Sequence, residues 1–136
     1  NYSGKAISIS KTTAPHALSY PFTAHFGISH GHAVSLTLND FLVFNFKNIQ
    51  HSNSKFDLKK RYKKIFNVTN TSNISELKLF INNIKLKAGL ENNFSKLGIN
   101  IQKIFPKILS GINDQRLSNN PITITKKDIK NILLKK

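Results

Sequence analysis

The chain has 136 residues, of which 39% are hydrophobic and ten are Phe, and its formal net charge is +15. No apolar run approaches the roughly 18 residues of a membrane span, and a chain without cysteine has neither disulfides nor thiolate ligands. The composition therefore excludes disulfide-stabilised and membrane-spanning classes, and it favours one globular domain with a cytoplasmic location.

The first third of the chain predicts two buried helices separated by a turn. Small and apolar residues over 4–20 favour a helix, which Pro15 and Pro21 must end or kink because each lacks an N–H. The glycines of residues 27–31 indicate a turn. The apolar stretch 32–46 is long enough to favour a buried helix over a strand. The residues expected to line the first helix are Ala6, Ile7, Ile9, Ala14, Ala17 and Leu18.

The middle of the chain predicts further helices. Residues 58–66 alternate apolar side chains with lysines at helical spacing, which is typical of an amphipathic helix. Ser75 is a candidate N-cap for the next helix, and Gly89 is its expected stop. Residues 100–112 indicate another helix, interrupted near Pro106.

The C-terminal part predicts a loop followed by a last helix. Residues 117–121 have the composition of a loop, and residues 125–128 (Thr-Lys-Lys-Asp) resemble a capping box with Asp in place of Glu. The apolar stripe Ile129, Ile132 and Leu133 follows. The only strand-like segment, 122–124, is too short to build a sheet. We therefore predict that residues 1–136 form a single all-α domain, a helical bundle.

The most distinctive feature is a cluster of histidines, since four of the five lie within residues 16–32. Imidazole is the commonest protein ligand for transition metals and the usual proton-transfer group near neutral pH. His16 and His30 flank a predicted turn, so the two can converge on one ion. A divalent ion needs further ligands, and none of the six acidic residues lies inside the cluster. The pattern predicts half of a metal site.

These residues resemble the iron-containing (group III) alcohol dehydrogenases, whose fold is shared with dehydroquinate synthase-like enzymes. The resemblance runs over 4–45 and is most specific at 12–20 (Thr-Thr-Ala-Pro-His-Ala-Leu-Ser-Tyr) and 27–33 (Gly-Ile-Ser-His-Gly-His-Ala). A weaker match covers 114–121 (Asp-Gln-Arg-Leu-Ser-Asn-Asn-Pro) together with Thr125, Asp128 and Ile129.

The resemblance implies a catalytic role for the histidine pair. In that family a histidine and the His of a Pro-His-Gly segment fourteen residues later bind the catalytic metal, Fe²⁺ or Zn²⁺. His16 and His30 match these positions, with Ser29 where Pro is usual. Many relatives have a His four residues after the first ligand, proposed to relay protons. Here that residue is Tyr20, which is a poorer base but a candidate catalytic hydrogen-bond donor.

The resemblance also implies what lies outside this chain. Family members are much longer, and their N-terminal domain carries a Gly-Gly-Gly-Ser phosphate loop for NAD(P) together with an Asp and a third His that complete the metal site. Nothing here matches either. We therefore expect the C-terminal metal-binding domain of a homo-oligomeric enzyme that acts on a small alcohol or aldehyde, inactive as an isolated fragment. Its partner is the N-terminal nicotinamide-binding domain of the same enzyme.

The substrate contacts are less constrained. Lys5 and the segment from Thr12 to Tyr20 look closer to the branch that reduces phosphonoacetaldehyde, which makes Lys5 and Lys11 candidates for facing a phosphonate. His32 is a further candidate substrate contact, with a surface position in the first turn of a helix as the equal alternative. His25 is expected to pack or to face solvent, and His51 is expected at the surface.

Two other functions remain open on sequence grounds. The positive charge suggests a basic helical module that binds nucleic acid or other anions, but Lys outnumbers Arg 19 to 2 while Asn and Ile each occur 17 times. That joint enrichment is typical of an AT-biased genome, and it still allows weak non-specific polyanion binding. The basic run 59–64 is expected to be a solvated helix face. The third possibility is a structural remnant that docks on a separately encoded N-terminal domain.

Overall fold

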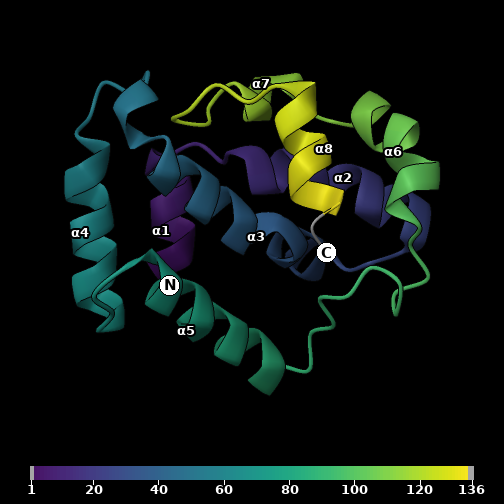
Figure 1. Ribbon diagram of the computed structural model, residues 1–136, viewed down its shortest axis with the longest axis horizontal. Coiled ribbons are helices and arrows are strands. Elements are labelled where there is room, and N and C mark those ends of the chain that lie inside the picture. Colours follow the sequence, from purple (N-terminus) through teal and green to yellow (C-terminus); the bar gives the residue numbers. More distant parts are fainter. Residues whose placement is uncertain (1, 135–136) are drawn as a thin grey trace.

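The computed structural model describes residues 2–134, and the regular structure in this range is helical throughout (Figure 1). The predicted all-α fold is confirmed, because no strand occurs among the described residues. The elements in chain order are α1 (Tyr2–Ile9), α2 (Ala14–Phe26), α3 (His30–Lys47), the short 3-10 helix η1 (Ile49–His51), α4 (Leu58–Thr69), α5 (Ile74–Lys87), α6 (Ile101–Ser110), α7 (Asp114–Leu117) and α8 (Lys126–Leu134).

Helices α2 and α3 pack along each other and form the centre of the domain (Figure 1). Gly27 ends α2 with a left-handed backbone, φ +63°, and its N–H bonds to the carbonyl of Thr23 at 3.1 Å. This conformation strains residues that carry a Cβ, which explains the glycine. Helices α6 and α7 then pack on α2, and α5 packs on α3, while α8 contacts both α3 and α6. The main core cluster has Leu18, Phe22, Leu36, Phe41, Ile108 and Leu133 among its largest fully buried side chains. A smaller cluster joins Leu58 and Tyr62 of α4 to Ile122.

The single helix predicted over 4–20 is wrong, since the chain forms two helices with a break between Ser10 and Thr13. The prediction took Pro15 as a helix stop. Proline lacks an N–H, but the first turn of a helix needs no intrahelical donor, and Pro15 therefore occupies the start of α2. Helix α2 also continues through Pro21 to Phe26.

Helix α1 is not buried, contrary to the expectation for its apolar residues. Ala6, Ile7 and Ile9 are exposed, with 89% of Ile9 accessible to solvent. The sequence correctly predicted burial of Ala14, Ala17 and Leu18, which belong to α2. The helical break separates these two sets, so the apolar residues before it do not share the buried face of α2.

Pro21 makes a close backbone contact with the turn after α6. A Cβ added at Gly111 would lie 3.1 Å from the Pro21 Cβ, a spacing tighter than most van der Waals contacts. Both atoms belong to stiff groups, because Pro21 is a ring within α2 and Gly111 lies in the backbone turn between α6 and α7. Glycine at position 111 therefore lets the α6–α7 turn approach α2.

Helices α4 and α5 differ from the predictions mainly at their ends. Helix α5 is capped by Asn73, whose side chain accepts bonds from the backbone N–H groups of Ser75 and Glu76, and not by Ser75. Asn places its acceptor on a short side chain just ahead of the first turn, as Ser does at other N-caps. Gly89 follows α5 with φ +67°, as expected for a helix stop.

Helix α6 is continuous through Pro106, so the predicted interruption is wrong. The predicted capping box before α8 is present in full. The Thr125 hydroxyl accepts from the Asp128 backbone N–H at 3.2 Å, and the Asp128 carboxylate accepts from the Thr125 N–H at 2.9 Å. Asp replaces Glu because its shorter side chain still reaches back to this N–H.

Two buried asparagines join α3 to the loop after α7. The Asn120 amide donates to the Asn45 side-chain oxygen at 2.7 Å, and the Asn45 amide donates to the Asn120 oxygen at 3.2 Å. Asn120 also donates to the carbonyl of Ile122 at 2.8 Å. Buried amides are costly to leave unpaired, so this reciprocal pair holds the loop against α3.

Among the described helices, none is both long and apolar enough to cross a membrane.

The asparagine pair gives a test of this packing. Asn120→Leu leaves the Asn45 amide buried without its partner, and we expect the free energy of unfolding in urea to fall by about 1–3 kcal/mol. The double variant Asn45→Leu/Asn120→Leu should lose less than the sum of the two single variants, because no orphaned amide remains. Strictly additive losses would contradict the pairing.

Candidate metal-binding half-site

His16 and His30 lie side by side although fourteen residues separate them. His16 is in the first turn of α2 and His30 is the first residue of α3. The helix predicted over residues 32–46 left His30 just before its first turn. His30 is instead part of α3, because this helix begins directly after the 27–29 turn. The chain returns along α2 through this turn, and the two ring centroids are 5.4 Å apart with an angle of 60° between the ring planes.

The separation of the rings fits a shared metal ion. Two imidazoles bound to one tetrahedral ion through metal–nitrogen bonds of about 2.1 Å have ring centres roughly 5 Å apart. His30 is exposed and His16 is half-buried, so an ion has access from solvent. The structure thus brings together the pair that the sequence singled out, while metal ligation by this pair stays a prediction.

Ser19 orients His30. The Ser19 hydroxyl donates to the carbonyl of His16 at 2.8 Å and lies 3.3 Å from Nδ1 of His30. Because its one proton is used in the first bond, the hydroxyl accepts from Nδ1–H of His30. The lone pair of the His30 Nε2 is then free to bind a metal. We call His16, Ser19 and His30 the histidine half-site.

The histidine half-site is incomplete within the described residues. No group of three or more histidine and acidic side chains that could hold a metal occurs between residues 2 and 134. Two neutral nitrogen donors do not satisfy a divalent ion, which usually takes a further nitrogen and a carboxylate.

Tyr20 and Arg116 extend the site on one side. The centroid of the Tyr20 ring is 6.0 Å from the centroid of the His30 ring. The Arg116 guanidinium lies over the Tyr20 ring, with Cζ 5.1 Å from its centroid. Arg116 comes from α7, which packs on α2. Its Nη1 donates weakly to the Thr12 hydroxyl at 3.4 Å. A phenol, a guanidinium and two imidazoles are thus gathered beside the start of α2.

The electrostatics of the site favour neutral His16. Burial, and then the positive charges of His30 and Arg116, lower the pKa of His16 below its ordinary value of 6.5. The neutral imidazole is the form that binds metals. As the pH falls, the His16 imidazole is protonated at a higher pH in the unfolded chain than in the folded chain. The contribution of His16 to folding stability is therefore present above pH 6.5 and is lost as the pH falls through the folded pKa.

The other residues singled out from the sequence lie outside this cluster. His32 Nε2 is 2.7 Å from the carbonyl oxygen of Glu91, so it donates to the loop that follows α5. Lys5 lies on the exposed helix α1, and Lys11 is exposed in the break before α2. His25 is exposed and its ring contacts that of Phe26. The contributions of Lys5, Lys11 and His32 to substrate binding stay predictions.

The charged side chains of the run 59–64 are exposed on α4, as expected for a solvated face.

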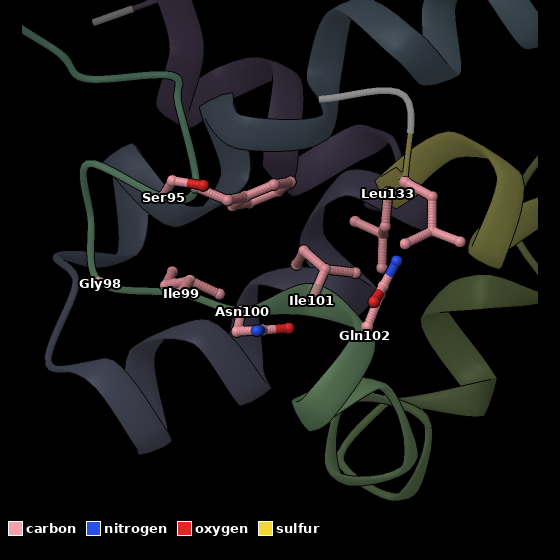
Figure 2. A pocket seen from close by; sticks show the side chains of 9 residues that line it. Ser95, Gly98, Ile99, Asn100, Ile101, Gln102 and Leu133 are labelled. Atoms are coloured by element: carbon pink, nitrogen blue, oxygen red, sulfur yellow. The ribbon is translucent and has the colours of Figure 1, made fainter.

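A separate pocket lies away from the histidines. It has a volume of about 540 Å³ and lies between the 94–102 segment and the end of α8 (Figure 2), lined by Phe94, Ser95, Gly98, Ile99, Asn100, Ile101, Gln102, Leu133 and Leu134. It contains no titratable side chain. The histidine half-site, in contrast, lies at the surface, which is the arrangement expected where a second domain closes the site.

Sequence reasoning missed Ser19 and Arg116 as parts of the site. Ser19 is three residues after His16, and this helical spacing was the signal that could have placed it beside that histidine. Arg116 is a hundred residues away in the sequence, and only the packing of α7 on α2 brings it to Tyr20. No local sequence pattern predicts a contact between residues so far apart in the chain.

Comparisons with known proteins relate the chain to one family. The sequence model described as "Fe-containing alcohol dehydrogenase family, C-terminal" matches residues 1–136. Phosphonoacetaldehyde reductase from Streptomyces viridochromogenes is 44% identical over 45 residues, which are 33% of this chain and 11% of that protein.

The fold has a solved counterpart. The structure of sulfoacetaldehyde reductase from Bifidobacterium kashiwanohense, a complex with NAD⁺, superposes with a TM-score of 0.72 at 23% sequence identity. The match covers 92% of this chain and 31% of that one, so the chain spans about a third of the length of its solved neighbour. At this identity the likeness concerns the fold, and it confirms the helical architecture expected from the resemblance.

The protonation of His16 can be measured directly. In metal-free protein, NMR titration of the imidazole Cε1–H signals should give His16 a pKa below 6.5, for the reasons above. In His30→Gln the pKa of His16 should rise, because a neighbouring positive charge is gone, yet remain below 6.5 because burial is the largest cause. An unchanged pKa in that variant would mean that the two rings do not interact.

Proposed function

The chain belongs to the Fe-containing alcohol dehydrogenase family, of which it matches the C-terminal part, and we propose that it supplies half of the metal site of an NAD(P)-linked alcohol dehydrogenase or aldehyde reductase. The observation that carries the proposal is the approach of the His16 and His30 rings to 5.4 Å at the surface of the domain. Their family positions and their separation both support a shared ion.

The donor set favours Fe²⁺ or Zn²⁺. Imidazole nitrogens suit both metals, and no thiolate is available. When bound, such an ion supplies a Lewis acid that polarises the substrate carbonyl while hydride passes to or from the nicotinamide. His16 and His30 would hold it through ring nitrogens, and Ser19 would keep the Nε2 of His30 directed to it by accepting from Nδ1–H.

Tyr20 is the proposed hydrogen-bond donor to the substrate oxygen. Its ring is 6.0 Å from that of His30, and its side chain is partly open to solvent. A phenolic O–H in this position would hold the substrate oxygen and deliver a proton to it as the carbonyl is reduced.

The second half of the site belongs to a nicotinamide-binding domain. The family resemblance supplies this inference, together with the third histidine and the acidic ligand. The named activity of the Streptomyces relative makes a small aldehyde with an acidic head group the favoured substrate. The chain without that domain should bind metal weakly and turn over no substrate.

Metal binding tests the half-site. Titration of the 136-residue chain with Zn²⁺ against a chromophoric chelator should give about one bound ion per chain. His16→Ala and His30→Ala should each weaken binding at least tenfold, and Ser19→Ala should weaken it less, because it removes a supporting bond and no ligand. His25→Ala and His51→Ala are matched controls, since both are exposed histidines outside the pair. Equal affinity of all five variants would contradict the proposal.

Activity tests the need for a second domain. The chain alone should show no NAD(P)H-dependent reduction of phosphonoacetaldehyde, because it holds two of the expected ligands and no phosphate loop. Mixing it with an N-terminal nicotinamide-binding domain of the same family should restore turnover, and His16→Ala should abolish the restored activity. Turnover by the chain alone would show that the domain is not half of a site.

A further inference from the structure

Arg116 is a cation without an anionic partner. It is half-buried, and among residues 2–134 no carboxylate lies within ion-pair distance of it. Of its five N–H donors, one makes a long contact of 3.4 Å to the Thr12 hydroxyl. A half-buried guanidinium with unused donors favours binding of an anion.

Bonds other than those of the Arg116 guanidinium also hold α7 in place. The Asn113 side chain caps α7 by accepting from the Arg116 backbone N–H at 2.9 Å. The Asn119 amide donates to the backbone carbonyl of Thr12 at 3.1 Å and so ties the end of this segment to the start of α2. The backbone of this segment is therefore anchored by bonds that do not involve the guanidinium.

The guanidinium and the histidine half-site both lie close to the Tyr20 ring. The centroid of this ring is 5.1 Å from Cζ of Arg116 and 6.0 Å from the centre of the His30 ring. A molecule that spans one aromatic ring can therefore contact the imidazoles at one end and the guanidinium at the other.

We propose that Arg116, with the Thr12 hydroxyl, binds the tetrahedral oxyanion of a short aldehyde whose carbonyl faces His16 and His30. The inference rests on the proposed function for the position of the carbonyl, while the anion site stands on the contacts of Arg116. The planar fork of arginine donates two parallel bonds to phosphonate or sulfonate oxygens, which a lysine does not. Arg116, and not the exposed Lys5 or Lys11, is then the residue that selects acidic substrates.

Anion binding to the chain itself provides the test. The protein is titrated separately with methylphosphonate and methanesulfonate at about 0.15 M salt, which screens contacts to exposed lysines. We expect saturable shifts of the Arg116 Nε–H and Tyr20 ring NMR signals with at least one of the two anions, and the two titrations identify which head group is preferred. Absence of shifts at Arg116 with both anions would overturn the proposal.

Substitution separates this site from non-specific attraction. Arg116→Gln should weaken binding about tenfold or more, and Arg116→Lys should weaken it less, because the charge remains while the fork is lost. Arg61→Gln is the matched control: Arg61 also lies over an aromatic ring, with Cζ 5.2 Å from the Phe56 centroid, but on α4. Equal weakening in the Arg61 and Arg116 variants would mean that net charge alone attracts the anion.

The two proposals fail independently. If Arg116→Gln abolishes anion binding while His16→Ala leaves Zn²⁺ binding unchanged, the oxyanion site stands and the metal half-site is wrong. If the histidine variants lose metal while Arg116→Gln binds methylphosphonate as tightly as the wild type, the reverse holds. Should Arg116→Gln unfold, as judged by far-UV circular dichroism, the Arg116→Lys variant and the wild-type shifts decide the question.

Discussion

The site depends on one constraint, which is the return of the chain along α2 after its C-terminal end. Gly27 adopts a left-handed backbone and closes α2, and the next two residues lead α3 back beside the first half of that helix. The packing of Leu18 and Phe22 with Leu36 in one core cluster then holds the two helices in register. His16 and His30 meet because of this turn and this core, and neither histidine needs the other to be in place.

Much of the helical architecture could be predicted, because its signals are local. The length of one apolar stretch identified α3, the spacing of apolar residues identified α4, and the Thr125–Asp128 pair identified the start of α8 through hydrogen bonds that span three residues. Two of the errors concern proline. Pro15 was expected to end or kink a helix and Pro106 to interrupt one, but the first begins a helix and the second lies inside one. The sequence shows that proline lacks a backbone N–H donor, but tertiary packing decides whether a helix tolerates a proline at that position.

The site was predictable only in part, for a related reason. His16 and His30 were identified through their spacing and a family resemblance, both of which are visible in the sequence. Arg116 contacts Tyr20 across a hundred residues, so its role follows from the packing of α7 on α2. The exposure of α1 was missed for the same reason: Ile7 and Ile9 are apolar, and composition alone does not say whether a partner surface covers them within this domain.

The contact between Pro21 and the α6–α7 turn has a consequence for the position of Arg116. The turn approaches α2 closely because residue 111 has no side chain, and α7, which carries Arg116, begins three residues later. A side chain at position 111 would meet the Pro21 ring at about 3.1 Å, so either the turn or α2 would have to shift. The absent Cβ of residue 111 therefore helps to set how closely Arg116 approaches the Tyr20 ring on α2.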